Sequence, residues 1–178
     1  ISSTPSHSPA FSRALPAQPK PLWPRARLLL PELHFPEQVL FQGAAGCFPF
    51  RGLELRFRRL PHGGAEYAGT PHYGLLLSEG SFRLLIAGDC AVASLELGAW
   101  IGAGPLQAAV LPFPWLTLPR GQTFLRQSLP SEQFFFCHLP APEDDRFGYR
   151  RAAERAAEQW SSPPEIQLLL EPFQTLRL

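Results

Sequence analysis

Three short segments, each after a run that predicts a strand, carry a side chain that can bind a metal ion. They place His62 in Leu-Pro-His-Gly-Gly, Asp89 in Ile-Ala-Gly-Asp-Cys and His138 in Phe-Cys-His-Leu-Pro. Imidazole and carboxylate groups are ligands for zinc and manganese, and a carboxylate can bridge two ions. If the apolar runs are strands, all three side chains lie on loops at strand ends, where functional residues gather above a rigid sheet. The pattern therefore predicts a metal site.

Each of these residues also has a purely structural interpretation. His62 precedes Gly63-Gly64 and can be a turn histidine. Asp89 can accept backbone N–H groups where a strand ends, as aspartate often does. The His–Asp–His set can also persist as a hydrogen-bonded network that holds no metal. Both interpretations stay open on the residues alone.

The elements that must position these side chains follow from the hydrophobic pattern. Leu53, Leu55 and Phe57 alternate with charged residues, which predicts a half-buried strand. Further strands are expected at 38–42, in a hairpin of 74–77 and 82–87 around a turn at 78–81, and at 108–113, 133–137, 166–170 and 175–178, with a turn at 43–46. Helices are expected at 9–15, 121–129 and 144–160, the last capped by Asp144 or Asp145. This mixed order predicts a layered α/β or α+β fold.

In this order, the three segments resemble the C-terminal two-thirds of the metallo-β-lactamase fold hydrolases, closest to the lactonase and phosphodiesterase-like branch. The resemblance covers residues 38–178. It implies an αβ/βα sandwich in which His62 follows one strand, Gly88-Asp89 ends another and His138 ends a late one. It also implies a single domain over residues 1–178, with its first strands lacking or truncated. Residues 1–36, rich in Pro and Ser, stand where the metal motif belongs, and 37–178 form the remaining sheet and helices.

The signature motif of that family, His-x-His-x-Asp-His, belongs near the start of this chain. Here Ser3 and Pro5 stand at the two leading histidines, His7 at the aspartate and Ser8 at the last histidine; a shift of one residue puts His7 at the last histidine. His7 is therefore a fourth candidate ligand. Two ions need about five or six protein ligands, whereas three ligands and a water suffice for one zinc. The resemblance assigns His62 and His138 to different ions, so a one-ion site requires rearrangement.

Two functions follow from the resemblance. The first is a metal-dependent hydrolase of an ester, lactone or phosphoester, in which one zinc or manganese ion carries a hydroxide and Asp89 orients the water as the catalytic residue. The second is a catalytically impaired protein that keeps the scaffold as a binding or assembly module, without a metal. Loss of the signature motif favours the second. Either protein would act on a small-molecule or protein partner. Assembly into a homo-oligomer is compatible with both functions.

Composition narrows the classes of partner. A net charge of +1 argues against a broad basic surface for nucleic acid, and no apolar stretch is long enough to span a membrane. Three cysteines without a CxxC pair argue against a disulfide framework and a cysteine zinc site. We therefore expect a reduced, cytoplasmic protein. The sequence contains no methionine, so we expect it to begin inside a longer protein.

Other polar and aromatic residues have simpler expected roles. His72 and Tyr73 are expected to pack at a strand entry rather than to contact a substrate. Cys90 and Cys137 are expected to be buried, inert thiols whose side chains point away from the neighbouring ligands. The charged run 150–155 is expected to be a solvated helix face, and the segment 113–115 to line a pocket or belong to the core.

Overall fold

The computed structural model describes residues 28–29, 38–39, 44–50, 52–161, 163–171 and 174. The chain divides into two compact units, residues 1–40 and 41–178. In the first unit, β1 (Leu28–Leu29) pairs in parallel with β2 (Gln38–Val39). The candidate ligand His7, the expected helix 9–15 and the expected strand 175–178 lie outside the described residues. The expectation of a single domain stays a prediction.

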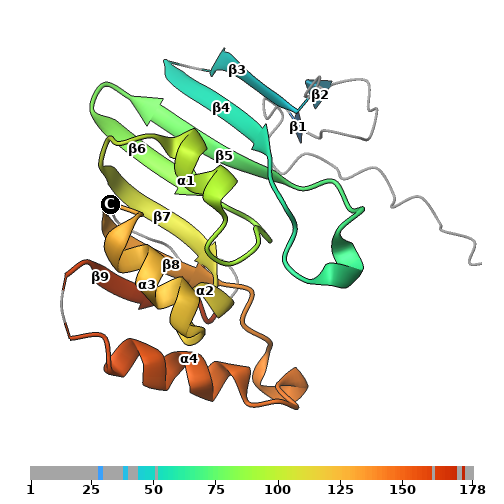
Figure 1. The fold of residues 1–178 in the computed structure, drawn as a ribbon, viewed down its shortest axis with the longest axis vertical. Coiled ribbons are helices and arrows are strands. Elements are labelled where there is room, and N and C mark those ends of the chain that lie inside the picture. The colour runs from blue at the N-terminus through green and yellow to red at the C-terminus, as the bar shows by residue number, and fades with distance from the viewer. Residues whose placement is uncertain are drawn as a thin grey trace, which may run out of the picture. The chain divides into compact units, whose positions relative to one another are not determined.

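The second unit is built on one mixed sheet of seven strands (Figure 1). In chain order these are β3 (Ala45–Phe50), β4 (Leu53–Arg59), β5 (Tyr73–Glu79), β6 (Phe82–Ile86), β7 (Leu106–Pro112), β8 (Ser131–Cys137) and β9 (Glu165–Leu168), and they lie side by side in the same order. The strands from β3 to β6 form an antiparallel meander, and those from β6 to β9 are parallel. The fold is therefore of the mixed α/β type.

Parallel strands need crossover connections, and helices supply them here. The helices are α1 (Leu95–Ile101), α2 (Pro114–Thr117), α3 (Pro119–Gln127) and α4 (Tyr149–Glu158), and short 3-10 turns occupy η1 (Ala65–Tyr67) and η2 (Pro142–Asp144). Figure 1 shows the four helices on one face of this sheet. No helix in the described part of the chain is long and apolar enough to cross a membrane.

The main core lies between the sheet and these helices. Its centre is Trp115, which is fully buried and meets Phe124 of α3 edge to face. From β8, Phe134 and Phe136 enter this core, while the intervening Phe135 is also buried. Because successive strand residues point to opposite faces, β8 is covered on both faces. This explains why its sequence is a continuous apolar run rather than an alternating one.

Two expected boundaries are wrong; a tertiary contact explains the first and a local proline effect the second. The expected turn 43–46 overlaps β3, where Gly46 pairs with Phe57 of β4. A Cβ at Gly46 would lie 2.5 Å from the Phe57 ring, so the glycine is needed for strand packing rather than for a turn. The expected helix 121–129 instead runs from Pro119 to Gln127. Proline suits the first helical position, since its missing N–H would have no partner there.

The helical content also differs from expectation in α4, in α1 and in α2, which covers Pro114–Thr117, where no helix is expected. The expected helix 144–160 begins only at Tyr149, because Gly148 adopts a left-handed conformation with φ of 70°. Asp145 still caps it, as its carboxylate accepts the backbone N–H of Tyr149 at 2.7 Å and of Arg150 at 3.0 Å. Helix α1 was not expected. It is short, contains Gly98 and is capped by the Ser94 side chain.

Candidate functional site

The sheet topology brings three of the four predicted ligands to one edge. Strand β4 is antiparallel to β5, which is antiparallel to β6, so β4 runs in the same direction as β6, β7 and β8. The carboxyl ends of these strands therefore meet at one edge of the sheet, where α/β proteins commonly bind ligands. His62 follows β4, Asp89 follows β6 and His138 follows β8 directly. The fourth candidate, His7, is outside the described residues.

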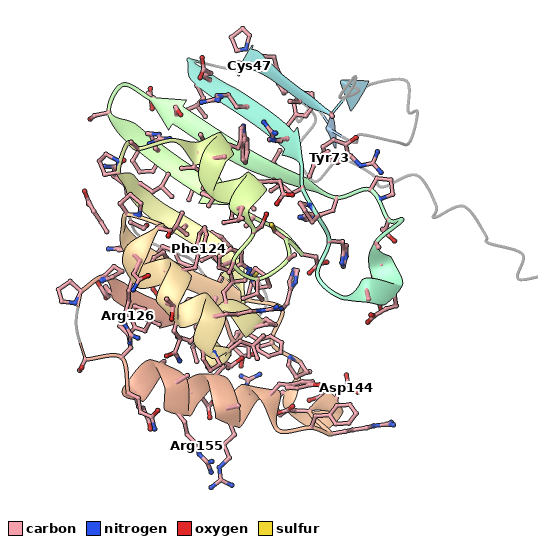
Figure 2. The ribbon with its side chains drawn as sticks, in the orientation of Figure 1. Cys47, Tyr73, Phe124, Arg126, Asp144 and Arg155 are labelled. Atoms are coloured by element: carbon pink, nitrogen blue, oxygen red, sulfur yellow. The ribbon has the colours of Figure 1, made fainter. Side chains whose placement is uncertain are left out.

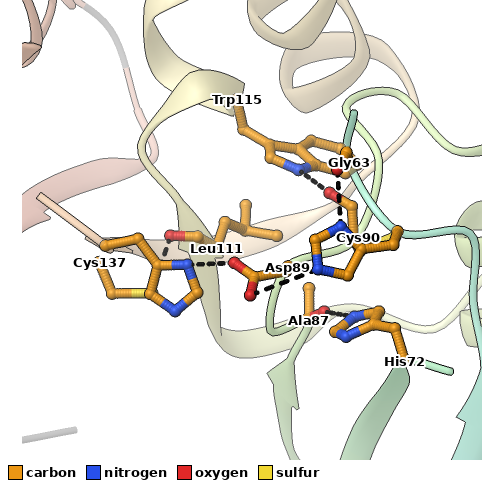
Figure 3. Close-up of polar contacts among 10 residues, drawn as sticks. Gly63, His72, Ala87, Asp89, Cys90, Leu111, Trp115 and Cys137 are labelled. Carbon is orange, nitrogen blue, oxygen red and sulfur yellow. Dashed lines mark hydrogen bonds and ion pairs between the residues drawn. The ribbon is translucent and has the colours of Figure 1, made fainter. Parts of the chain in front are cut away.

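Asp89 lies at the centre of this cluster, between the two imidazole rings (Figure 3). Its Oδ1 contacts Nδ1 of His138, and its Oδ2 lies 3.7 Å from Nε2 of His62. Each carboxylate oxygen thus faces a different histidine. The Asp89 and His138 side chains are nearly half exposed, at 48% and 46%, whereas that of His62 is 17% exposed. The cluster is therefore open to solvent on the His138 side.

Backbone hydrogen bonds hold the loop of His62 against the loop of Asp89. The N–H of Gly63 donates to the carbonyl of Asp89 at 2.8 Å, and the N–H of Ala91 donates to the carbonyl of Pro61 at 2.8 Å. From the core, the buried Trp115 indole donates to the Cys90 carbonyl at 3.2 Å. These bonds are drawn in part in Figure 3. The two ligand candidates are consequently placed by main-chain contacts and not by their own side chains alone.

The hydrogen bond of the His62 ring fixes which nitrogen carries its proton. Nδ1 lies 2.6 Å from the Gly63 carbonyl oxygen, which can only accept, so Nδ1 is the donor. In the neutral ring, Nε2 then presents a lone pair to Oδ2 of Asp89. Two acceptors facing each other at this distance are satisfied when a cation lies between them. That cation can be a proton on Nε2 or a metal ion.

His138 has an unusual backbone conformation. Its φ is 62°, in the left-handed region that few residues other than glycine adopt. The preceding carbonyl, that of Cys137, accepts the N–H of Phe113 at 2.9 Å, which keeps the strand end paired to the segment after β7. Such a conformation costs on the order of 1–2 kcal/mol and tends to occur at functional sites. It directs the His138 ring toward Asp89.

His72 supports the site rather than adding a ligand to it. Its Nε2 donates to the Ala87 carbonyl at 2.8 Å, and its ring meets the His62 ring edge to face. Burial lowers the pKa of His72, which keeps the ring neutral. The ring also lies over Gly88, whose φ is 55° and where a Cβ would come within 2.5 Å of His72 Cε1. The Gly-Asp sequence therefore needs glycine for both conformation and space.

A pocket of about 280 Å³ opens beside His62 and Asp89. Within the described part of the chain it is lined by His62, Gly63, Gly64, Asp89, Cys90, Ala91, Val92, Pro112, Pro114, Leu118 and Arg120. The segment 113–115 thus divides between the two expected roles: Pro114 lines the pocket and Trp115 is core. Arg120 was not among the predicted site residues. It follows no strand, and only the packing of α2 and α3 brings it to the pocket.

The cysteines are free thiols. Cys90 is buried, and burial raises its pKa to about 12. Cys137 is half-buried, its thiol lies 3.4 Å from the Leu111 carbonyl, and burial raises its pKa to about 11. Both thiols are therefore protonated near neutral pH, as expected for inert groups. Cys47 is exposed on β3, away from this cluster (Figure 2).

Three potential donors do not yet make a metal centre. Among the described residues, no group of three or more His, Cys, Asp and Glu is arranged so that it could hold a metal ion. The two histidines face different oxygens of Asp89, His62 facing Oδ2 and His138 facing Oδ1, so their ring nitrogens are not directed at one position that an ion could occupy. No protein-family model matches the sequence, and no curated protein matches it. Function is therefore inferred from the geometry of this site.

Proposed function

We propose that this protein is a metallo-β-lactamase-like protein with an incomplete metal centre, and that it acts as a binding module rather than as a hydrolase. The observation that carries the proposal is the direct contact between His138 Nδ1 and Asp89 Oδ1. Asp89 is the residue that would bridge ions in such a centre, and here one of its oxygens is engaged by a histidine. The contact of His138 with Asp89 and the hydrogen bond of His62 to the Gly63 carbonyl account for the arrangement of the cluster without a metal.

The topology of the sheet supports the resemblance. The expected order of a strand before His62, a hairpin, a strand before Asp89 and a strand before His138 is accommodated by consecutive strands of one sheet. All three residues emerge at the same sheet edge, as the resemblance implies. The αβ/βα sandwich as a whole, with a second sheet, remains part of the proposal.

The number of donors supports the incomplete centre. Two metal ions need about five or six protein ligands. The described residues bring three potential ligands together, His62, Asp89 and His138. A two-ion centre does not fit this set. The residues that stand at the signature motif, Ser3, Pro5, His7 and Ser8, include three that are poor zinc ligands.

One observation favours the second candidate, a hydrolase that uses a single ion. His62 Nε2 and Asp89 Oδ2 face each other at 3.7 Å, both as acceptors. Zinc bonds of about 2.0–2.2 Å in tetrahedral geometry separate two ligand atoms by roughly 3.3–3.6 Å, so this pair nearly has the spacing that zinc requires. Such an ion would activate water toward an ester, lactone or phosphoester. His138 would have to turn from Asp89 to join it.

Metal analysis of the purified chain separates the two candidates. Zinc and manganese content would be measured for the wild type, His138→Ala and Asp89→Asn. Asp144→Asn is the matched control, because Asp144 is exposed and forms no ion pair with the three residues of the cluster (Figure 2). We expect no stoichiometric metal and a melting temperature that does not respond to added zinc. A bound ion would stabilise the fold. One equivalent of metal that is lost in the two site variants and kept in Asp144→Asn would refute the binding-module proposal in favour of the hydrolase.

A further inference from the structure

The pocket beside His62 and Asp89 has a division of chemistry along its walls. One part is apolar, built from Val92, Pro112, Pro114 and Leu118. The polar part is lined by Asp89, His62 and one arginine, Arg120. Its volume of about 280 Å³ is just below the ~300–1,000 Å³ typical of ligand pockets, so it suits a small molecule.

The guanidinium of Arg120 is not used by the fold. Two other arginines of this unit, Arg83 and Arg150, have clear structural tasks. Arg83 donates to the carbonyls of Gly104 and Ile101, and Arg150 pairs with Glu171. Arg120, by contrast, is exposed, and its guanidinium makes no ion pair or hydrogen bond with any described residue. A cation that lines a pocket and has no partner in it is available to a ligand.

We infer that this pocket binds a small carboxylic acid, with the ligand carboxylate on Arg120 and an apolar body against Pro112, Pro114 and Leu118. The inference deepens the proposed binding function and rests on it. A guanidinium matches a carboxylate through two parallel N–H···O bonds, which are stronger than neutral hydrogen bonds. These residues, together with Val92, provide an apolar surface against which the rest of the ligand can pack.

The charges of the pocket favour a carboxylate over a phosphate monoester. A phosphate monoester carries about −1.5 to −2 charges near neutral pH. The pocket offers one arginine, Arg120, to this charge, and the acidic residue Asp89 also lines the pocket. A second negative charge would be repelled by Asp89, whereas a single carboxylate is matched by Arg120. A ligand with one negative charge is therefore the better complement.

The test is a chemical-shift titration of the ¹⁵N-labelled, chelator-treated chain at constant ionic strength. The probes are butyrate, the neutral isostere butyramide and inorganic phosphate. Arg120→Gln removes the guanidinium. Arg155→Gln is the matched control, because it changes the net charge equally while Arg155 projects from the outer side of α4 into solvent (Figure 2). Thermal melts of both variants verify that they are folded.

We expect butyrate to shift the amides of Gly63, Gly64 and Arg120, and butyramide to bind at least about tenfold more weakly. Arg120→Gln should weaken butyrate binding by a similar factor, and Arg155→Gln should leave it unchanged. Equal binding of butyrate and butyramide, stronger binding of phosphate, an unaffected Arg120→Gln variant or no binding at all would each overturn the inference. Because the protein is stripped of metal, these outcomes are independent of the metal analysis, which alone decides the proposed function.

Discussion

Replacement of Gly88 by alanine tests how the site is built, because this glycine meets two separate demands. Its φ is 55°, and a Cβ would lie 2.5 Å from Cε1 and 3.3 Å from Nε2 of His72. Gly80, in the turn between β5 and β6, has nearly the same φ of 56° but open space around the position of a Cβ. The pair therefore separates the conformational cost of alanine from the steric one.

The expected magnitudes follow from these two demands. Alanine in the left-handed region costs on the order of 1–2 kcal/mol, and this cost is common to Gly80→Ala and Gly88→Ala. At Gly88 the His72 ring must also move, which breaks its hydrogen bond to the Ala87 carbonyl. That bond contributes about 1 kcal/mol, and the displaced ring loses packing as well. We expect Gly88→Ala to lower the free energy of unfolding by about 1–2 kcal/mol more than Gly80→Ala.

Urea denaturation at pH 7.5 measures this difference, provided that the slope of the transition is the same in all variants. A second pair isolates the ring: in a His72→Ala background the added cost of Gly88→Ala should fall to that of Gly80→Ala. The reasoning would be refuted if Gly88→Ala were no worse than Gly80→Ala in the wild type. It would equally fail if removal of the His72 ring gave no relief.

Two further predictions concern titratable groups. Burial lowers the pKa of His72 below its ordinary 6.5, so His72 binds a proton more readily in the unfolded chain than in the folded one. The free energy of unfolding should therefore fall as the pH drops below about 6.5. In urea denaturation recorded from pH 7 to 5, His72→Gln should make this fall smaller. A disulfide reagent at pH 8 should label Cys47 first and Cys90 only on unfolding, since a thiol with a pKa of about 12 is almost fully protonated there. Cys47→Ser should abolish the fast phase, and fast labelling that persists when Cys47 and Cys137 are both replaced by serine would contradict the burial of Cys90.

The local hydrophobic pattern was sufficient to predict most of the strands of the second unit. The alternation at Leu53, Leu55 and Phe57 predicts β4, and the expected hairpin of β5 and β6 is present. Strand β5 starts one residue earlier and ends two residues later than expected, and β6 ends one residue earlier. The pattern failed where contacts distant in sequence decide the outcome. Gly46 belongs to a strand because the Phe57 ring occupies the space of its side chain. Helix α1 has seven residues, one of them Gly98, and is too short to give a clear periodic signal. Its Leu97, Trp100 and Ile101 are buried in the core, so packing on the sheet stabilises this helix.

The three ligand candidates show the division between sequence and structure most clearly. The sequence by itself determined that His62, Asp89 and His138 follow apolar strands, because strand formation depends on local hydrophobic pattern. Only the tertiary structure decided that they meet. It also decided that each histidine faces its own Asp89 oxygen, and that Arg120 joins the same pocket. Strand order, strand direction and helix packing set these distances, and they depend on contacts between residues far apart in the chain, which no local pattern records.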